Sequence, residues 1–174
     1  MQRLKIVFSG PMGAGKTQAI ASLSDIPVVS TEVQNTDLEA HDKVLTTVGM
    51  DYGELILEGR TSIGLYGTPG QQRFSFIWPI LVQGALGVII LIDHSAIDPV
   101  KDLAHYLQTF DKIYKGRIII GVTQMDKKPE REFDIYRHWL RDTQRNLPIF
   151  AVDMRKKEDV LLLVETIITA LEQD

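Results

Sequence analysis

The 174-residue sequence contains no cysteine, and this absence excludes several kinds of chemistry together. Without a thiol there is no disulfide framework, no thiolate metal site and no cysteine nucleophile. There is also no attachment point for a prenyl or palmitoyl group, and Met1-Gln2 does not match a myristoylation start. We therefore expect no lipid anchor.

The sequence also lacks a long apolar run and an excess of basic residues. No uninterrupted apolar stretch reaches the ~18 residues that a transmembrane helix needs, so we expect no transmembrane segment. The 19 Lys and Arg residues are outnumbered by 23 Asp and Glu residues, which gives a net charge of −4. A mildly acidic chain is a poor nucleic-acid binder. We expect a cytoplasmic protein that is a monomer or a weak oligomer and has no nucleic-acid partner.

What the sequence does contain is an alternation of short apolar runs and amphipathic stretches, over a length typical of one domain, residues 1–174. Buried strands are expected at 4–8, 88–92, 118–120 and 149–152, a hairpin at 54–66, and helices at 99–110, capped by Asp98, at 133–140 and at 160–171. Only the stretch 25–46 reads as long and irregular. The order predicts an α/β domain with helices on both faces of a mostly parallel, six-stranded sheet that has one antiparallel edge strand.

A phosphate-binding motif, GPMGAGKT, follows the first predicted strand at residues 10–17. In such a loop the glycines let backbone N–H groups point at phosphate oxygens, a lysine carries the charge, and a hydroxyl ligates Mg²⁺. Those roles predict phosphate contacts from Gly10, Gly13, Ala14, Gly15 and Lys16, with Thr17 as phosphate contact and metal ligand. The motif predicts a P-loop NTPase domain, but kinases of small metabolites, ATPases and GTPases all share it.

Residues that follow the later strands favour guanine over adenine. Asp126 comes shortly after the strand at 118–120, in the sequence Thr123-Gln124-Met125-Asp126. A carboxylate there accepts hydrogen bonds from guanine N1–H and N2–H₂, a pair of donors that adenine does not present. After the last strand, backbone N–H groups of Asp153 and Met154 are expected to reach the guanine O6.

Two further segments carry side chains suited to the γ-phosphate. Gly70 and Gln71 follow the second hairpin strand: a glycine N–H can contact the γ-phosphate, and a glutamine can orient the attacking water. Thr47, just before the expected hairpin, offers a second hydroxyl to Mg²⁺.

In this combination the motifs resemble the Ras-like small GTPase superfamily over essentially the whole chain, and most closely its bacterial and archaeal branch near the MglA-type GTPases. The resemblance implies GTP or GDP as the bound nucleotide, Mg²⁺ held by Thr17 and Thr47, and hydrolysis that depends on Gln71, Lys16 and Thr47. It also implies protein effectors and an activator, of the roadblock type in the MglA branch. Thr47 matches the first-switch threonine because residues 48–52 follow it as the family's next strand.

The sequence departs from the family pattern at several positions. Gly67 stands where the family has the aspartate that supports Mg²⁺, and Asp93 is one candidate replacement, although it also suits a strand-end turn. Met12 replaces a loop glycine, and residues 25–59 contain no arginine. We therefore expect slow hydrolysis that needs a partner.

Two other functions remain open at this point. The chain is alternatively a nucleotide-binding interaction module with negligible hydrolysis, for which Met12 and Gly67 both argue. A P-loop kinase of a small metabolite fits less well, because no arginine-bearing lid is recognisable.

Overall fold

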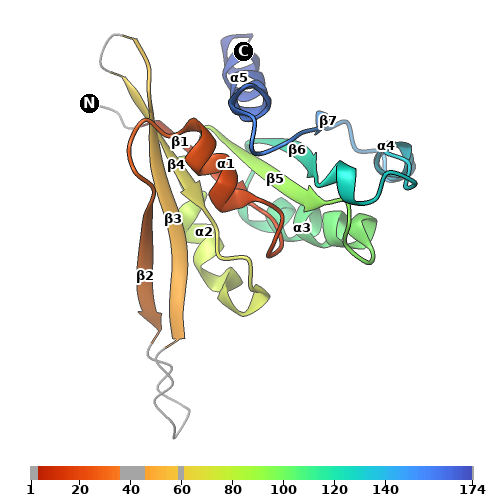
Figure 1. Cartoon of the computed structure of the whole chain (residues 1–174), viewed down its shortest axis with the longest axis horizontal. Helices are drawn as coiled ribbons and strands as arrows, with labels where there is room; N and C mark the ends of the chain where they lie inside the picture. Colours follow the sequence, from red (N-terminus) through yellow and green to blue (C-terminus); the bar gives the residue numbers. More distant parts are fainter. Residues whose placement is uncertain (1–3, 36–45, 59–60, 174) are drawn as a thin grey trace, which may run out of the picture.

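The computed structural model describes residues 4–35, 46–58 and 61–173, and its centre is a seven-stranded sheet in the order β2-β3-β4-β1-β5-β6-β7 (Figure 1). Neighbouring strands are parallel from β4 through β1 to β7, whereas β3 runs antiparallel to both β2 and β4. The strands are β1 Leu4–Ser9, β2 Val29–Asn35, β3 Thr46–Ile56, β4 Ser62–Gly67, β5 Gly87–Asp93, β6 Arg117–Thr123 and β7 Ile149–Ala151.

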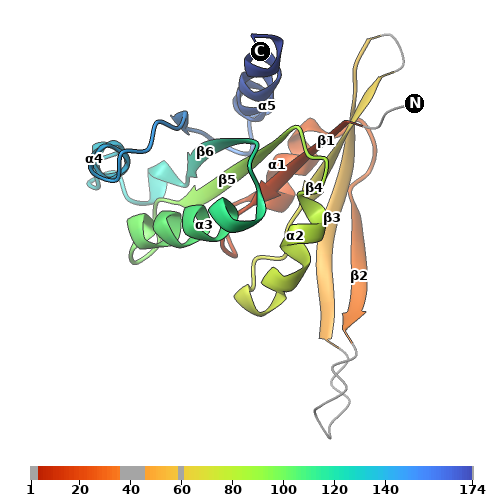
Figure 2. The ribbon, with the colours of Figure 1, turned by 180° about the vertical axis from the view of Figure 1, so that it is seen from behind.

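Helices cover the sheet on two sides, as the apolar runs predict (Figures 1 and 2). They are α1 Lys16–Leu23, α2 Trp78–Leu81, α3 Pro99–Ile113, α4 Asp134–Asp142 and α5 Lys157–Glu172, with short 3₁₀ helices at Gln72–Ile77 and Met125–Lys127. Within β1, Ile6 and Phe8 pack into the core with α1 and α5, while Val7 packs with α2, α3 and α4. Both faces of a central strand are therefore buried, which explains its uninterrupted apolar sequence.

The structure differs from the sequence prediction at the edge next to α1. The stretch expected to be irregular contains β2, and β3 begins at Thr46, eight residues before the expected hairpin start at position 54. The sheet therefore has seven strands and not six. β2 reads V-S-T-E-V-Q-N, and its backbone pairs with β3 along its whole length. An edge strand held by backbone hydrogen bonds lacks the apolar pattern that marks a buried strand. Residues 36–45 and the expected hairpin turn at 59–60 lie outside the described residues.

The remaining elements are close to prediction, and they bring the loops that carry the predicted motifs to one edge of the sheet. Helix α3 starts as expected at Pro99, with the Asp98 side chain accepting a hydrogen bond from the Lys101 N–H at 3.1 Å. The carboxyl ends of β1, β5 and β6 lie side by side, and the loops that follow them carry the predicted motifs. Within the described part of the chain, no helix combines the length and apolarity needed to cross a bilayer.

Candidate nucleotide-binding site

The loop between β1 and α1 has the backbone geometry that its glycines predict. Gly10, Gly13 and Gly15 have φ values of 143°, 80° and 100°. A Cβ atom on Gly10 would lie 2.1 Å from the Leu91 carbonyl oxygen, so no larger residue fits between β1 and β5. The loop therefore wraps tightly at the N-terminus of α1, an arrangement that favours anions.

Lys16 points back into this loop. Its Nζ donates hydrogen bonds to the carbonyl oxygens of Gly10 at 2.6 Å and Pro11 at 2.7 Å. Burial lowers the pKa of Lys16 to about 8, and the nearby Asp51 carboxylate only partly opposes this shift. The ammonium group is thus held at the centre of the loop, where phosphate oxygens can replace the two carbonyls.

Gly70 lies directly against the phosphate loop. A Cβ atom at this position would come within 2.9 Å of the Met12 backbone nitrogen and 3.0 Å of Lys16 Nζ. The preceding Thr68 is tied to β1, since its N–H donates to the Phe8 carbonyl at 2.9 Å and its hydroxyl bonds the Ser9 hydroxyl at 2.9 Å. The structure therefore brings Gly70 and Lys16 together, as the sequence predicts.

Gln71 follows Gly70, but its amide is engaged by a neighbour. Arg73 Nε donates to Gln71 Oε1 at 2.7 Å, and the Arg73 guanidinium lies 4.7 Å from the centre of the Phe74 ring. Phe74 is buried, whereas Phe76 is exposed. The expected water-positioning glutamine is thus held by an arginine that packs on an anchored ring.

The missing carboxylate at position 67 is replaced in space by Asp51. Asp51 is paired with Gly67 between β3 and β4, and a Cβ atom on Gly67 would lie 3.7 Å from Asp51 Oδ2. The Asp51 carboxylate accepts hydrogen bonds from the Thr17 hydroxyl and, at 2.9 Å, from the Ser30 hydroxyl. Sequence reasoning did not assign this role, because the residue that contacts Thr17 comes from a different strand.

Asp93, the candidate suggested by the sequence, is turned elsewhere. Its Oδ1 accepts hydrogen bonds from the Ser95 N–H at 2.8 Å and the Ser95 hydroxyl at 2.6 Å. It is therefore a strand-end turn residue, the second of the two roles that the sequence allows.

Thr47 is not brought to Thr17 in this structure. It pairs with Gln34 between β3 and β2, four positions along β3 from Asp51, a separation of about 13 Å in an extended strand. The expectation that it precedes the hairpin strand is wrong, since β3 begins at Thr46.

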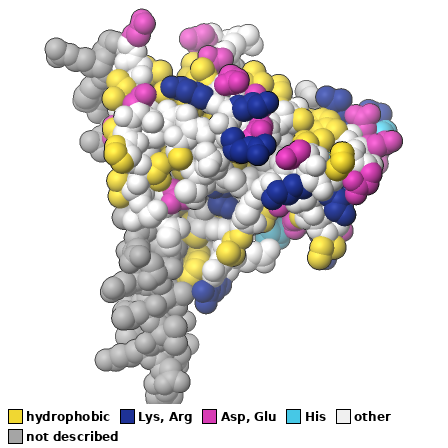
Figure 3. Space-filling model, viewed as in Figure 1, with side chains coloured by type: hydrophobic (Ala, Val, Ile, Leu, Met, Phe, Trp, Pro, Cys, Tyr) yellow, Lys and Arg dark blue, Asp and Glu magenta, His cyan; other side chains and the backbone are white. Residues whose placement is uncertain are grey.

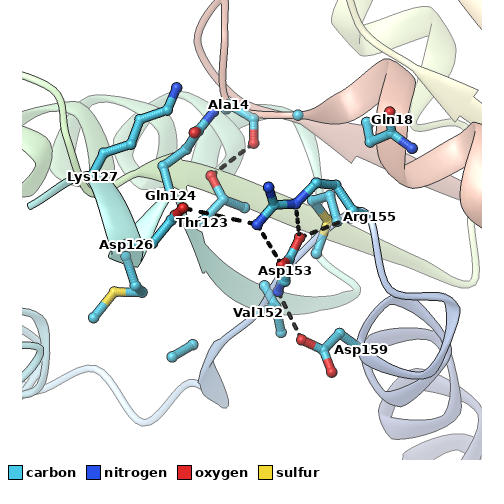
Figure 4. A pocket seen from close by; sticks show the side chains of 14 residues that line it. Ala14, Gln18, Thr123, Gln124, Asp126, Lys127, Val152, Asp153, Arg155 and Asp159 are labelled. Carbon is cyan, nitrogen blue, oxygen red and sulfur yellow. Dashed lines mark hydrogen bonds and ion pairs between the residues drawn. The ribbon is translucent and has the colours of Figure 1, made fainter. Parts of the chain in front are cut away.

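A pocket of about 460 Å³ adjoins the phosphate loop on the side of β6 and β7 (Figure 4). Thr123 Oγ1 donates to the Ala14 carbonyl at 2.8 Å, and Gln124 Nε2 donates to the Gly13 carbonyl at 3.1 Å. These two bonds fasten the loop that carries Asp126 to the phosphate loop. Asp126 lines the pocket, and its side chain is 68% exposed.

The loop after β7 closes the other side of the pocket. The Asp153 N–H, expected to contact the base, donates to Asp159 Oδ2 at 2.8 Å, and its contact with a base stays a prediction. Met154 lines the pocket, and its carbonyl accepts a bond from the Ser22 hydroxyl at 2.5 Å. Arg155 holds the pKa of Asp153 at about 2 through side-chain and backbone hydrogen bonds.

Charged side chains of both signs surround this region. Near the middle of the face seen in Figure 3, Lys and Arg side chains lie next to Asp and Glu side chains. Among the residues that the structure describes, no three His, Cys, Asp or Glu side chains are grouped as a metal site. A metal here would instead meet the Thr17 hydroxyl, an oxygen donor of the kind that Mg²⁺ takes, with the Asp51 carboxylate beside it.

Buried His94 is a positioning residue that sequence reasoning missed. Its Nδ1 bonds the Tyr136 hydroxyl at 2.7 Å and its Nε2 bonds the Arg131 carbonyl at 3.0 Å. Arg131 in turn donates to the His94 carbonyl at 2.6 Å and the Ala96 carbonyl at 2.7 Å. The loop carrying Asp126 is thus anchored to the end of β5. The sequence does carry one indication of this role, since His94 directly follows the apolar strand β5.

Several known proteins are similar to this chain. The profile of a family described as "conserved hypothetical ATP binding protein" matches residues 27–173. The chain is 22% identical over 130 residues to intraflagellar transport protein 22 of Chlamydomonas reinhardtii, covering 72% of this chain and 64% of that protein. It is 28% identical over 127 residues to Ras-related protein Rab-18 of Caenorhabditis elegans, covering 71% of this chain and 57% of that protein.

A third similarity is to GTP-binding protein ypt1 of Schizosaccharomyces pombe, 28% identical over 132 residues, covering 71% of this chain and 59% of that protein. The chain thus spans less than two thirds of the length of these relatives. The family profile covers most of the chain. The chain belongs to the family described as conserved hypothetical ATP binding proteins.

Proposed function

We propose that this protein is a GTP-binding molecular switch that hydrolyses GTP slowly and signals to protein partners. The observation that carries the proposal is the pocket containing Asp126, which adjoins the phosphate loop and is fastened to it through Thr123 and Gln124. A purine in this pocket would present its edge to Asp126 while its phosphates extend toward Lys16. A carboxylate at that edge accepts hydrogen bonds from the N1–H and N2–H₂ groups of guanine. With adenine the carboxylate lacks this pair of donors, which lowers the affinity.

The phosphate side supports hydrolysis in the manner of other GTPases. Water attacks the γ-phosphorus as its bond to the β–γ bridging oxygen breaks, and GDP and phosphate are released. Lys16 lies where it can bind the β- and γ-phosphates, the Gly70 N–H is beside it, and Gln71 is next in the chain. The bond between Arg73 and Gln71, together with the exposed Met12 next to Gly70, supports a slow intrinsic rate.

Mg²⁺ is part of this proposal, and the residues present fit it. Thr17 would hold the ion directly, with Asp51 accepting hydrogen bonds from water around it. When bound, Mg²⁺ supplies charge neutralisation on the β- and γ-phosphates. Thr47 would join only after β3 and its neighbours rearrange, because four strand positions separate it from Asp51. We infer that γ-phosphate contact drives this rearrangement of the first switch.

The proposal includes a single GTP-binding domain over residues 1–174. It also includes a cytoplasmic location and a monomeric or weakly oligomeric state. The T-P-G-Q sequence at residues 68–71 supports a place near the MglA-type branch, and with it an activator of the roadblock type.

Nucleotide affinity with and without Mg²⁺ tests the proposal. GTP and GDP should bind more tightly than ATP, and Asp126→Ala should remove the preference. ATP binding tighter than GTP would overturn it and would revive a small-metabolite kinase, for which the family description naming ATP is the one favouring observation. Guanine binding without phosphate release, even with an activator, would instead identify a non-hydrolysing interaction module.

A further inference from the structure

A single arginine spans the mouth of the base pocket between two aspartates (Figure 4). Arg155 Nε donates to Asp153 Oδ1 and its terminal nitrogen donates to Asp153 Oδ2, both at 2.8 Å. The same terminal nitrogen lies 3.9 Å from Asp126 Oδ2. The guanidinium is therefore bonded to one carboxylate and stops short of the other.

Asp153 is the fixed end of this arrangement. Its N–H is bonded to Asp159, the preceding Val152 N–H donates to the Val122 carbonyl at 2.9 Å, and its own carboxylate accepts the Arg155 N–H at 3.0 Å. Its side chain is 27% exposed, against 70% for Arg155. The arginine is held by a well-anchored partner, whereas the Asp126 carboxylate can bind either the arginine or a ligand.

We propose that Arg155 is a specificity-determining residue of the purine site and that Asp153 keeps it from closing on Asp126. This inference rests on the proposed function, in which Asp126 reads guanine. At 3.9 Å the guanidinium is too far for a hydrogen bond to Asp126. The acceptor positions of Asp126 therefore stay available for the base.

Without Asp153 the balance changes. An arginine fork forms its best bond with a carboxylate in the bidentate geometry, and Asp126 is the next carboxylate within reach. A guanidinium bonded to Asp126 would occupy the acceptors that guanine N1–H and N2–H₂ need. Loss of Asp153 should thus harm guanine binding only while Arg155 is present.

The test compares Asp153→Asn, Arg155→Ala and the double variant in the full chain, with Lys157→Ala as an exposed charge control. Equilibrium binding of GDP and of IDP, which lacks the 2-amino group, is measured for each. We expect Asp153→Asn to weaken GDP binding by about threefold to tenfold and to lower the ratio of GDP to IDP affinity. The double variant should recover wild-type affinity to within about twofold.

The role of Arg155 and the proposed function have separate tests. Equally weak GDP binding by Asp153→Asn and the double variant, or no effect of Asp153→Asn, overturns the inference about Arg155 and leaves the proposed function standing. If Asp126→Ala leaves the ratio of GDP to IDP affinity unchanged, Asp126 does not read guanine, and this overturns both. Thermal unfolding of each variant shows whether any loss reflects misfolding.

Discussion

Asp51 lies directly opposite Gly67 on the neighbouring antiparallel strand, and its carboxylate accepts a hydrogen bond from the Thr17 hydroxyl. A carboxylate expected at position 67 is thus supplied from across the ladder. Moving an acid between paired positions of two strands keeps it near the same hydroxyl, because side chains of directly opposed residues lie on the same face of the sheet.

The first prediction follows from this pairing. Asp51→Asn should lower the Mg²⁺ affinity of the GDP-bound protein by about 10- to 100-fold, the usual cost of losing a group that orients metal ligands. Adding Gly67→Asp to that variant should recover much of the lost Mg²⁺ affinity, since the new carboxylate would lie close to the position of the Asp51 carboxylate. The measurement is GDP dissociation as a function of free Mg²⁺.

Asp93→Asn is the matched control, because Asp93 bonds only to Ser95 among the described contacts of its side chain. It should leave the Mg²⁺ dependence unchanged. If Asp93→Asn and Asp51→Asn shift it equally, the assignment of Asp51 is wrong.

A second prediction concerns pH. Burial lowers the pKa of Lys16 to about 8, and a bound phosphate stabilises its charged form, so the pKa rises in the complex. Above about pH 8, where Lys16 of the free protein loses its proton, nucleotide binding should therefore take up a proton. The nucleotide affinity should fall by at most about tenfold per pH unit between pH 8 and 9. Calorimetry in buffers of different ionisation heat measures the proton uptake.

Lys16→Arg provides the comparison, because a guanidinium stays charged over this range. Its binding should be weaker or unchanged in strength but nearly independent of pH. The same slope in both proteins would show that another group titrates.

A third prediction addresses stability. His94→Phe leaves the Tyr136 hydroxyl and the Arg131 carbonyl without their buried partner, which should cost about 1–3 kcal/mol in the free energy of unfolding. Urea unfolding measures the loss. His105→Asn, at an exposed position on α3, should change stability by less than about 0.5 kcal/mol. Equal effects at both positions would contradict the role of the His94 network.

A fourth prediction concerns Gln71, the residue proposed to position the attacking water. Gln71→Ala should slow single-turnover GTP hydrolysis by about tenfold or more while GDP affinity holds. Arg73→Ala releases the Gln71 amide and should raise the rate by about twofold to fivefold, the scale of one exposed hydrogen bond. In a Gln71→Ala background, Arg73→Ala should have no further effect. A rate that still changes there would mean that Arg73 acts by another route.

Local sequence predicted much of the fold and the phosphate loop. The apolar runs of β1 and β5 are buried on both faces, so their composition alone marks them as central strands. The loop at residues 10–17 depends on glycine φ angles and a following helix, both of which are local properties. β2 was not predictable in this way, because its partner is the backbone of β3 and not an apolar face.

The amino-acid sequence by itself determined the α/β class, the phosphate loop and the presence of an aspartate after β6, because each depends on neighbours along the chain. Only the tertiary structure decided which carboxylate meets Thr17, that the Asp153 N–H is bonded to Asp159, and that Arg155 stands between two aspartates. Those relationships depend on strand register and on side chains from separate loops. Hydrogen bonds act over about 3 Å, a precision that spacing along a sequence does not carry.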